Sequence, residues 1–150
     1  MDVADNIIEQ LEKVGNDLEG EVIFPVLGNN VLLTLGLSGT GVVEPAHKES
    51  INWLHNNIKN LFPIIEKAVF NYYISVLPDY HLGLEEYAEE LMPKIHDPEQ
   101  VWNHVIDPGV FIFPEEEGGE THIEFECTFD VEHGLRVIFK NGKLIKVGLE

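Results

Sequence analysis

The longest regular pattern along the chain is a series of apolar residues spaced three and four positions apart. The series consists of Ile51, Leu54, Ile58, Leu61, Ile65, Val69, Tyr72 and Val76. Such spacing places one apolar stripe along a helix of about seven turns, which predicts a long helix packed on a large surface. Pro63 interrupts the stripe without changing its phase, so we expect a kink or a restart near residues 60–62. Pro78 is predicted to end this helix.

Near the N-terminus the pattern changes from helical spacing to alternation. Residues 7–18 have apolar positions at helical spacing, which predicts a first helix capped by Asp5 or Asn6. Beyond Gly20, apolar and polar residues alternate on both sides of the letters LGNN at residues 27–30, which are typical of a turn. The alternation predicts a β-hairpin, and a loop with several glycines then leads to the long helix.

Two short helices and one strand are predicted between the long helix and the C-terminal region. The segment LEEYAEELM has helical character up to Pro93. In HDPEQVWNHV, Asp97 is expected as the N-cap, Pro98 as the first helical residue and Gln100 as its capping-box partner. GVFIFP is then a strand candidate, and the acidic letters EEEGGE form a loop.

The C-terminal residues predict a three-stranded antiparallel meander. In THIEFECTFD, apolar and polar residues alternate strictly, so one face is predicted to be buried. DVEHG is expected to form the first turn, because Asp130 can bind backbone donors and Gly134 can adopt positive φ. Asn141 and Gly142 are the typical residues of a two-residue hairpin turn. The expected cross-strand pairs are Phe129 with Leu135, Cys127 with Val137, Phe125 with Phe139, Phe139 with Leu144, and Glu124 with Lys140.

These elements together predict an α+β fold. The expected antiparallel sheet combines the N-terminal hairpin with the C-terminal three-stranded meander, and it packs on a long kinked helix and shorter helices. Residues 1–148 suit a single domain, whereas Leu149 and Glu150 resemble a vector-derived scar. Ile138 and Ile145 are expected to be neighbours on the outer face of the sheet. The N-terminal helix or a second subunit could cover them, so the oligomeric state is open.

Charge changes the range of expected partners. The chain has 27 acidic and 9 basic residues, for a net charge of −18. Such a charge repels phosphate backbones and anionic lipid, so neither nucleic acid nor a membrane is expected as a partner. It attracts a basic protein, although solubility alone also explains it. The single Cys127 and the lack of an apolar leader or span predict a cytoplasmic protein without a disulfide.

The residues Asp130, Glu132 and His133 are the main candidates for chemistry. In one interpretation they belong to the hairpin turn, and in the other they form a metal or proton-transfer site. Their spacing matches neither an EF-hand loop nor a two-histidine zinc helix. Glu124 and Glu126 could act as paired carboxylates, but a solvent-facing strand also explains them. No phosphate loop or serine nucleophile elbow is found, and no cofactor is expected.

The same C-terminal segment resembles a bacterial family of uncharacterised proteins. Its signature is an aromatic residue, Asp, any residue, Glu-His-Gly-Leu, then two strands separated by a glycine turn. The matching residues are Phe129, Asp130, Glu132, His133, Gly134 and Leu135. The family commonly has Trp at the aromatic position, so Phe129 is a departure. The resemblance implies no established activity, although members are suggested to be immunity-type partners of toxins.

Two functions are therefore open. The first is a non-enzymatic, immunity-like interaction module that binds a basic protein through acidic surface. Its candidate contact residues are Glu85, Glu86, Glu89 and Glu90 on the predicted acidic helix, and Glu115, Glu116, Glu117 and Glu120 on the acidic loop. The second is a small-molecule or metal-dependent activity at Asp130, Glu132 and His133, which requires these side chains to converge on a concave site.

Overall fold

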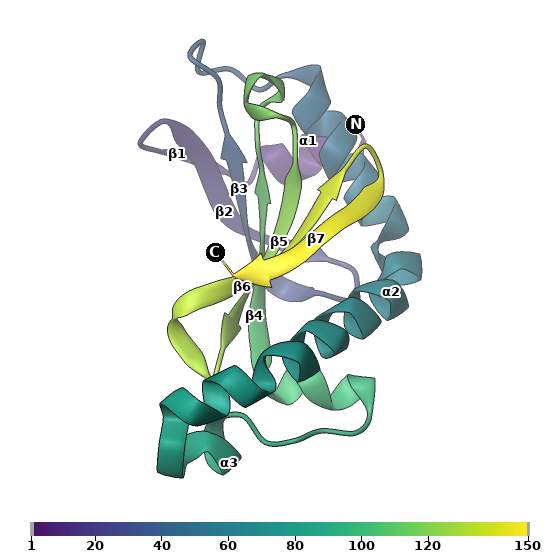
Figure 1. Cartoon of the computed structure of the whole chain (residues 1–150). Coiled ribbons are helices and arrows are strands. Elements are labelled where there is room, and N and C mark those ends of the chain that lie inside the picture. Colours follow the sequence, from purple (N-terminus) through teal and green to yellow (C-terminus); the bar gives the residue numbers. More distant parts are fainter. Residues whose placement is uncertain (1, 150) are drawn as a thin grey trace.

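Residues 2–149 of the computed structural model form a seven-stranded sheet with a long helix along one face (Figure 1). Met1 and Glu150 lie outside the described residues, and Glu150 is the second residue of the predicted scar. The first residue of that scar, Leu149, pairs with Leu135 at the end of the last strand. The predicted α+β class is confirmed.

The strands lie in the sheet in the order in which they occur along the chain. They are β1 (Glu12–Val14), β2 (Asp17–Phe24), β3 (Gly28–Gly36), β4 (Val105–Ile112), β5 (Thr121–Cys127), β6 (Asp130–Lys140) and β7 (Lys143–Leu149). Neighbouring strands are antiparallel, except that β3 and β4 are parallel. A parallel pair requires a crossover connection, and the helical residues between β3 and β4 supply it.

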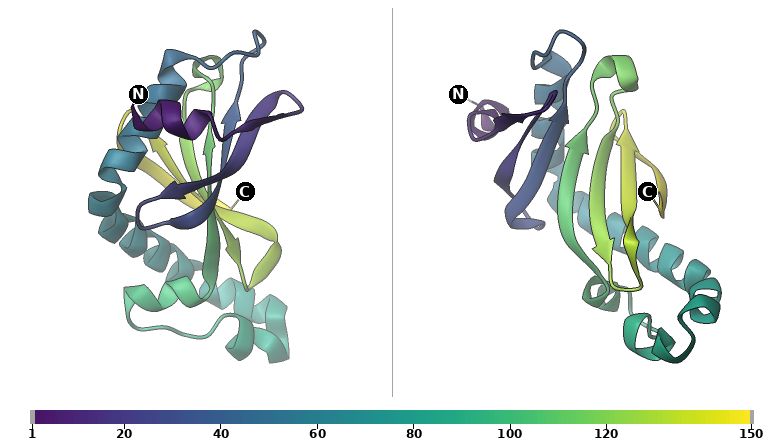
Figure 2. Two further views of the ribbon diagram at one scale, coloured as in Figure 1. Left: turned by 180° about the vertical axis from the view of Figure 1, so that it is seen from behind. Right: turned by 90° about the vertical axis from the view of Figure 1, so that its left-hand side faces the viewer.

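The crossover is dominated by helix α2 (Pro45–Leu84), which bends along its length as it follows the sheet (Figures 1 and 2). Of the two alternatives predicted near residues 60–62, a kink or a restart, the restart is wrong, and so is the predicted end at Pro78, because one helix continues through both prolines. Both prolines are exposed. Proline removes the hydrogen bond to the carbonyl four residues earlier, and on an exposed helix face that carbonyl can be hydrated instead.

Shorter helical segments complete the chain. They are α1 (Val3–Ile8), η1 (Glu85–Tyr87), α3 (Ala88–Leu91), η2 (Pro98–Asn103) and η3 (Glu115–Glu117). The predicted cap of η2 is confirmed, since the side-chain Oε1 of Gln100 accepts the backbone N–H of Asp97 at 3.2 Å. No helix in residues 2–149 is long and apolar enough to cross a membrane.

The predicted N-terminal helix is misplaced as well as too long, because α1 begins at Val3 and its N-cap is Asp2 instead of Asp5 or Asn6. Helix α1 ends at Ile8, and the residues that follow form the hairpin of β1 and β2. Gly15 adopts φ +61° at the turn of this hairpin, a conformation that glycine adopts without strain. Leu18 then pairs with Leu35 in the sheet, so sheet pairing overrides the helical spacing of this short segment.

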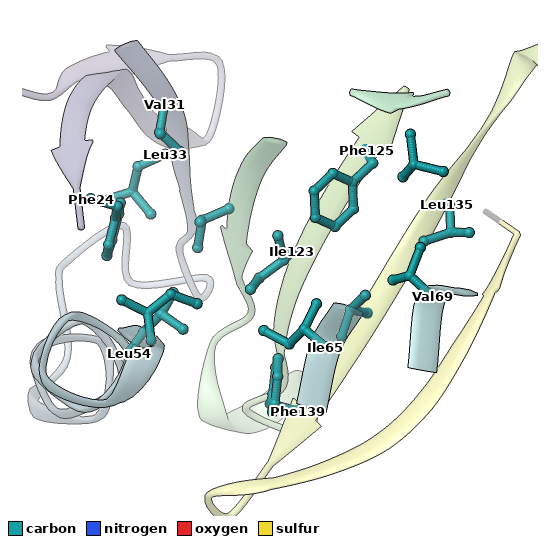
Figure 3. Packing of buried hydrophobic residues seen from close by; sticks show 14 of the residues in the cluster. Phe24, Val31, Leu33, Leu54, Ile65, Val69, Ile123, Phe125, Leu135 and Phe139 are labelled. Atoms are coloured by element: carbon teal, nitrogen blue, oxygen red, sulfur yellow. The ribbon is translucent and has the colours of Figure 1, made fainter. Parts of the chain in front are cut away.

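The core lies between α2 and the sheet. Figure 3 shows Leu54, Ile65 and Val69 of α2 directed at apolar side chains of the strands. Phe125 and Phe139 are both buried in this cluster, which confirms that they share one face of the sheet. On the opposite face Ile23 and Leu32 stay exposed, so a single layer of helix covers the sheet.

Helix α1 does not cover the outer face of the sheet. The backbone N–H of Ala4 donates to the Asn52 Oδ1 atom at 3.0 Å, so α1 packs beside the first turns of α2. Ile138 is half-buried, and Ile145 is exposed. They are neighbours as expected, because Ile145 lies at the irregularity between the pairs Ile138–Lys146 and Phe139–Leu144.

The predicted register of β5 and β6 is wrong by four residues. Phe125 pairs with Leu135 instead of Phe139, and Glu124 pairs with Arg136 instead of Lys140. Side chains alternate with a period of two, so an even shift leaves every residue on its predicted face. The expected pair of Phe139 with Leu144 is confirmed. The β2–β3 turn also differs from the prediction, because it falls before Gly28, the first residue of β3.

Candidate functional site

The turn between β5 and β6 is formed by Thr128 and Phe129, not by residues 130–134. Thr128 is held by tertiary contacts: its backbone N–H donates to the carbonyl of His104 at 2.9 Å, and its Oγ1 donates to the carbonyl of Leu91 at 2.9 Å. Phe129 is buried against the rings of Tyr73 and Tyr80. These contacts fix a tight turn that local sequence signals do not indicate.

The predicted DVEHG turn is instead a bulge at the start of β6. Between the pairs Cys127–Asp130 and Phe125–Leu135, five steps along β6 oppose two steps along β5. The extra residues leave the ladder and bend the strand, as bulges do. The bulge lies at the periphery as expected, and it directs the side chains of Asp130 and His133 toward the end of α2.

Asp130 joins the bulge to helix α2 through both of its carboxylate oxygens. The Tyr80 phenol donates to Oδ2 of Asp130 at 2.5 Å. The other oxygen, Oδ1, accepts the backbone N–H of His133 at 3.0 Å and lies 3.1 Å from Nδ1 of the His133 ring. The Asp130 side chain is 13% exposed, and the His133 side chain is 53% exposed. A carboxylate held by three contacts is a rigid acceptor at the edge of the molecule.

The hydrogen bonds decide the ionisation of this carboxyl. Burial alone raises the pKa of Asp130, but the hydrogen bonds from Tyr80 and His133 outweigh it and leave the pKa below its ordinary value. Burial, and then the contact with Asp130, raise the pKa of the Tyr80 phenol. At neutral pH Asp130 is therefore an anion and Tyr80 a neutral donor.

A pocket of about 400 Å³ lies beside this group. It is formed by the last turns of α2 on one side and by the β5–β6 corner on the other. Its lining residues are Asp79, Tyr80, Gly83, Leu84, Phe129, Asp130, Glu132 and His133. The pocket, called here the corner pocket, combines aromatic and aliphatic walls with three carboxylates. All three candidates of the second predicted function, Asp130, Glu132 and His133, line it.

The predicted acidic helix lies next to the corner pocket. Its four glutamates directly follow the pocket residue Leu84 in η1 and α3, and all four are exposed. They are Glu85, Glu86, Glu89 and Glu90. Within residues 2–149, none of them forms an ion pair or a side-chain hydrogen bond. These glutamates and the corner pocket are together called the acidic end.

The second predicted acidic region is far from the acidic end. Glu115, Glu116 and Glu117 form η3, which precedes β5, whereas the acidic end adjoins the turn that follows β5 (Figure 1). Glu120 is partly buried, and its Oε1 atom lies 3.0 Å from Nε2 of His122. A strand of seven residues separates the two regions by about 20 Å, so the structure brings together only some of the predicted contact residues.

Exposed apolar side chains accompany the acidic end. Leu82 in the last turn of α2 is 81% exposed, Tyr87 in η1 is 57% exposed, and Val131 in the bulge is 91% exposed. Apolar and aromatic side chains surrounded by charged ones are typical of protein interaction surfaces. The composition therefore differs from that of a purely solvated acidic surface.

Sequence reasoning missed Asp79, Tyr80 and Leu84 as site residues because it ended the helix at Pro78. A signal was present: Tyr72, Val76, Tyr80 and Leu84 follow one another at steps of four. Continuation of the apolar stripe beyond the proline indicates that the same helix face remains packed.

The other candidate residues do not form a second cluster. Glu124 Oε1 lies 3.5 Å from Arg136 Nε, and Glu126 is exposed. Cys127 is buried, as predicted. Two histidines, His47 and His122, are buried. Within residues 2–149, no group of three or more His, Cys, Asp or Glu side chains is arranged to hold a metal ion.

Comparison with known proteins gives a family but no activity. Residues 7–150 match the family described as a domain of unknown function, DUF6985. No curated protein matches the chain, and no solved structure matches it.

Proposed function

Since the chain belongs to the DUF6985 family, whose description names no activity, we propose from its surface that it is a non-enzymatic, immunity-like interaction module that binds a basic protein. The acidic end is the contact surface. The proposal rests on the convergence there of a carboxylate-lined pocket, exposed apolar side chains and four exposed glutamates that form no ion pair within residues 2–149.

Electrostatics supports a basic partner. The four glutamates follow one another within two short helical turns, so their charges repel one another. Within residues 2–149, the ion pairs of lysine and arginine, Lys48–Asp5 and Arg136–Glu124, involve other parts of the molecule. A basic surface placed on the acidic end would remove this repulsion, speed association and select against acidic proteins.

The arrangement of the acidic end favours binding over chemistry. Both oxygens of Asp130 are already engaged, and Glu132 is exposed at the rim of the pocket rather than joined to His133. A general base must reach a substrate proton, whereas the Asp130 carboxylate lies against the protein's own phenol. The group therefore serves better as a fixed negative charge than as a proton acceptor.

A charge-matched pair of variants tests the proposal. One variant replaces Glu85, Glu86 and Glu89 by Gln, and the other replaces Glu115, Glu116 and Glu117 by Gln, so both lose three charges. The probe is a short peptide that alternates arginine with glycine, and its Kd is measured by calorimetry at about 20 mM and about 150 mM salt. We expect the first variant to weaken binding about tenfold and the second less than twofold.

Equal weakening in the two variants would show that only net charge matters, which contradicts a defined contact surface. Absence of binding to the wild-type protein at both salt concentrations would overturn the proposal altogether. Circular dichroism of both variants checks that the fold is retained.

A further inference from the structure

We infer that the corner pocket receives an arginine side chain of the basic partner, as the anchor of the contact at the acidic end. This inference rests on the proposed function and adds to it the identity of the group that the pocket recognises. The main evidence is that two aromatic rings, a leucine and three carboxylates line the same pocket of about 400 Å³.

The walls suit the stem and the plane of an arginine side chain. The ring of Tyr80 stands against the ring of Phe129 with centroids 5.0 Å apart and an angle of 75° between the planes. Both rings line the pocket, together with Leu84. A guanidinium group is planar, is weakly hydrated and stacks on aromatic faces, while its methylene stem packs on apolar surface.

The charge of the pocket selects a cation. Asp79, Asp130 and Glu132 contribute three carboxylates, and His133 is the single basic group in the lining. The two oxygens of Asp130 accept from Tyr80 and His133, so Asp130 acts through its charge. Asp79 and Glu132 are exposed, and their oxygens are free to accept the N–H groups of a guanidinium fork.

The surroundings suit an anchor at the centre of a contact. The exposed Leu82 and Val131 are each the immediate chain neighbours of residues that line the pocket, and Glu85 and Glu86 follow Leu84 directly. An arginine that enters the pocket would thus contact the apolar side chains of Leu84 and Phe129 in the lining, and the carboxylates of Glu85 and Glu86 follow directly along the chain. Anchors of this kind, in which Arg, Trp and Tyr are enriched, carry most of the binding energy of protein interfaces.

Gly83 offers a way to close the pocket without disturbing the fold. It lines the pocket within α2, and a Cβ atom added there meets nothing within 4 Å. Gly83→Leu therefore fills the opening, while Gly83→Ala leaves it open. Because Gly is a poorer helix former than either residue, both variants should fold at least as well as the wild type.

The experiment uses a capped Gly-Arg-Gly peptide and its citrulline analogue as probes. Citrulline replaces the guanidinium by an uncharged urea group of nearly the same shape. Each peptide is titrated into the ¹⁵N-labelled full chain, and amide chemical shifts are followed by NMR. We expect the arginine peptide to shift the amides of Gly83, Phe129 and His133, which line the pocket, and to leave Gly118 unshifted at the opposite end of β5.

The variants separate the pocket from the general charge. Gly83→Leu should weaken binding of the arginine peptide at least fivefold, and Gly83→Ala should change it less than twofold. Removal of the rim charges by Asp79→Asn with Glu132→Gln should also weaken it about fivefold, whereas the charge-matched pair Glu115→Gln with Glu117→Gln should not.

The outcomes distinguish the inference from the function on which it rests. Shifts confined to the pocket amides, lost in Gly83→Leu, support the inference. The inference is overturned if the citrulline peptide gives the same shifts, or if Gly83→Leu binds the arginine peptide as well as Gly83→Ala does, because the pocket then does not recognise the guanidinium group. In that case the acidic end can still bind a basic peptide. If no basic peptide binds at all, the proposed function fails as well.

Discussion

At the scale of single residues, Asp130 has a structural as well as a surface role. Its carboxylate receives the Tyr80 phenol from α2 on one oxygen and the His133 backbone on the other. It thus ties the bulge of β6 to a helix fifty residues earlier in the chain. A sequence motif containing Asp, Glu and His can reflect this connection without any catalytic step.

Tyr80→Phe should show this connection in the pH dependence of stability. Because the pKa of Asp130 lies below its ordinary value, its stabilisation is complete above the pKa of an unfolded aspartate, about 4, and is lost as the pH falls through the lower folded pKa. We expect the variant to lose about 1–2 kcal/mol at pH 7, since a hydrogen bond to a charged group is removed. The loss should be smaller at pH 3.

Urea unfolding at both pH values measures the effect, and Tyr87→Phe is the matched control. Tyr87 is 57% exposed, and within residues 2–149 its phenol has no hydrogen-bond partner. A loss that is the same at pH 7 and at pH 3 would contradict the role of the Asp130 charge.

At the scale of elements, the β5–β6 hairpin shows how a strand can be assigned to the correct face with the wrong partners. The predicted and observed registers differ by an even number of residues, and burial depends only on which face a side chain occupies. The observed turn consists of Thr128 and Phe129 and is therefore shorter than the predicted turn of residues 130–134. The surplus residues therefore form the bulge that begins at Asp130.

Hydrogen exchange should distinguish a bulge from a regular strand within β6. Residues 131–134 have no paired residue in either neighbouring strand of the described sheet, whereas residues 135–140 pair with β7. The amides of Val131, Glu132 and Gly134 should exchange at least a hundredfold faster than those of Val137 and Phe139, because local opening costs less where the ladder is interrupted. Uniform protection along β6, measured by NMR, would show that the strand is regular.

At the scale of the whole molecule, the net negative charge is large, and only some of the acidic side chains have partners within the described part of the protein. The net charge of −18 exceeds what a domain of this size needs for solubility. Glu120 and Glu124 lie close to basic side chains, whereas Glu85, Glu86, Glu89 and Glu90 form no ion pair or side-chain hydrogen bond within residues 2–149. The two acidic regions at opposite ends of the sheet present separate surfaces (Figure 1).

The self-repulsion of these charges should make stability depend on salt. Raising KCl from about 10 mM to about 0.5 M shortens the Debye length from roughly 30 Å to a few ångströms and screens the repulsion. We expect the Tm, measured by circular dichroism, to rise by roughly 4 °C. The variant with Gln at residues 85, 86 and 89 should show a smaller rise. A Tm that falls with added salt would mean that attractive ion pairs dominate.

Local patterns in the sequence determined most of the helices and strands and their buried faces, except for the hairpin of β1 and β2 and the last turns of α2. The long stripe of α2, the alternation in β5 and the cap at Asp97 were predictable because each depends on residues within a few positions of one another. The acidic surface followed from composition alone.

Tertiary structure decided the parts that depend on distant contacts. Packing of Tyr80 on Phe129 carries α2 past Pro78, and the bonds from Thr128 to His104 and Leu91 place the turn before Asp130. The corner pocket arises only where those two elements meet. No local pattern encodes it, because its walls come from residues about fifty positions apart that are brought together by burial of the apolar faces.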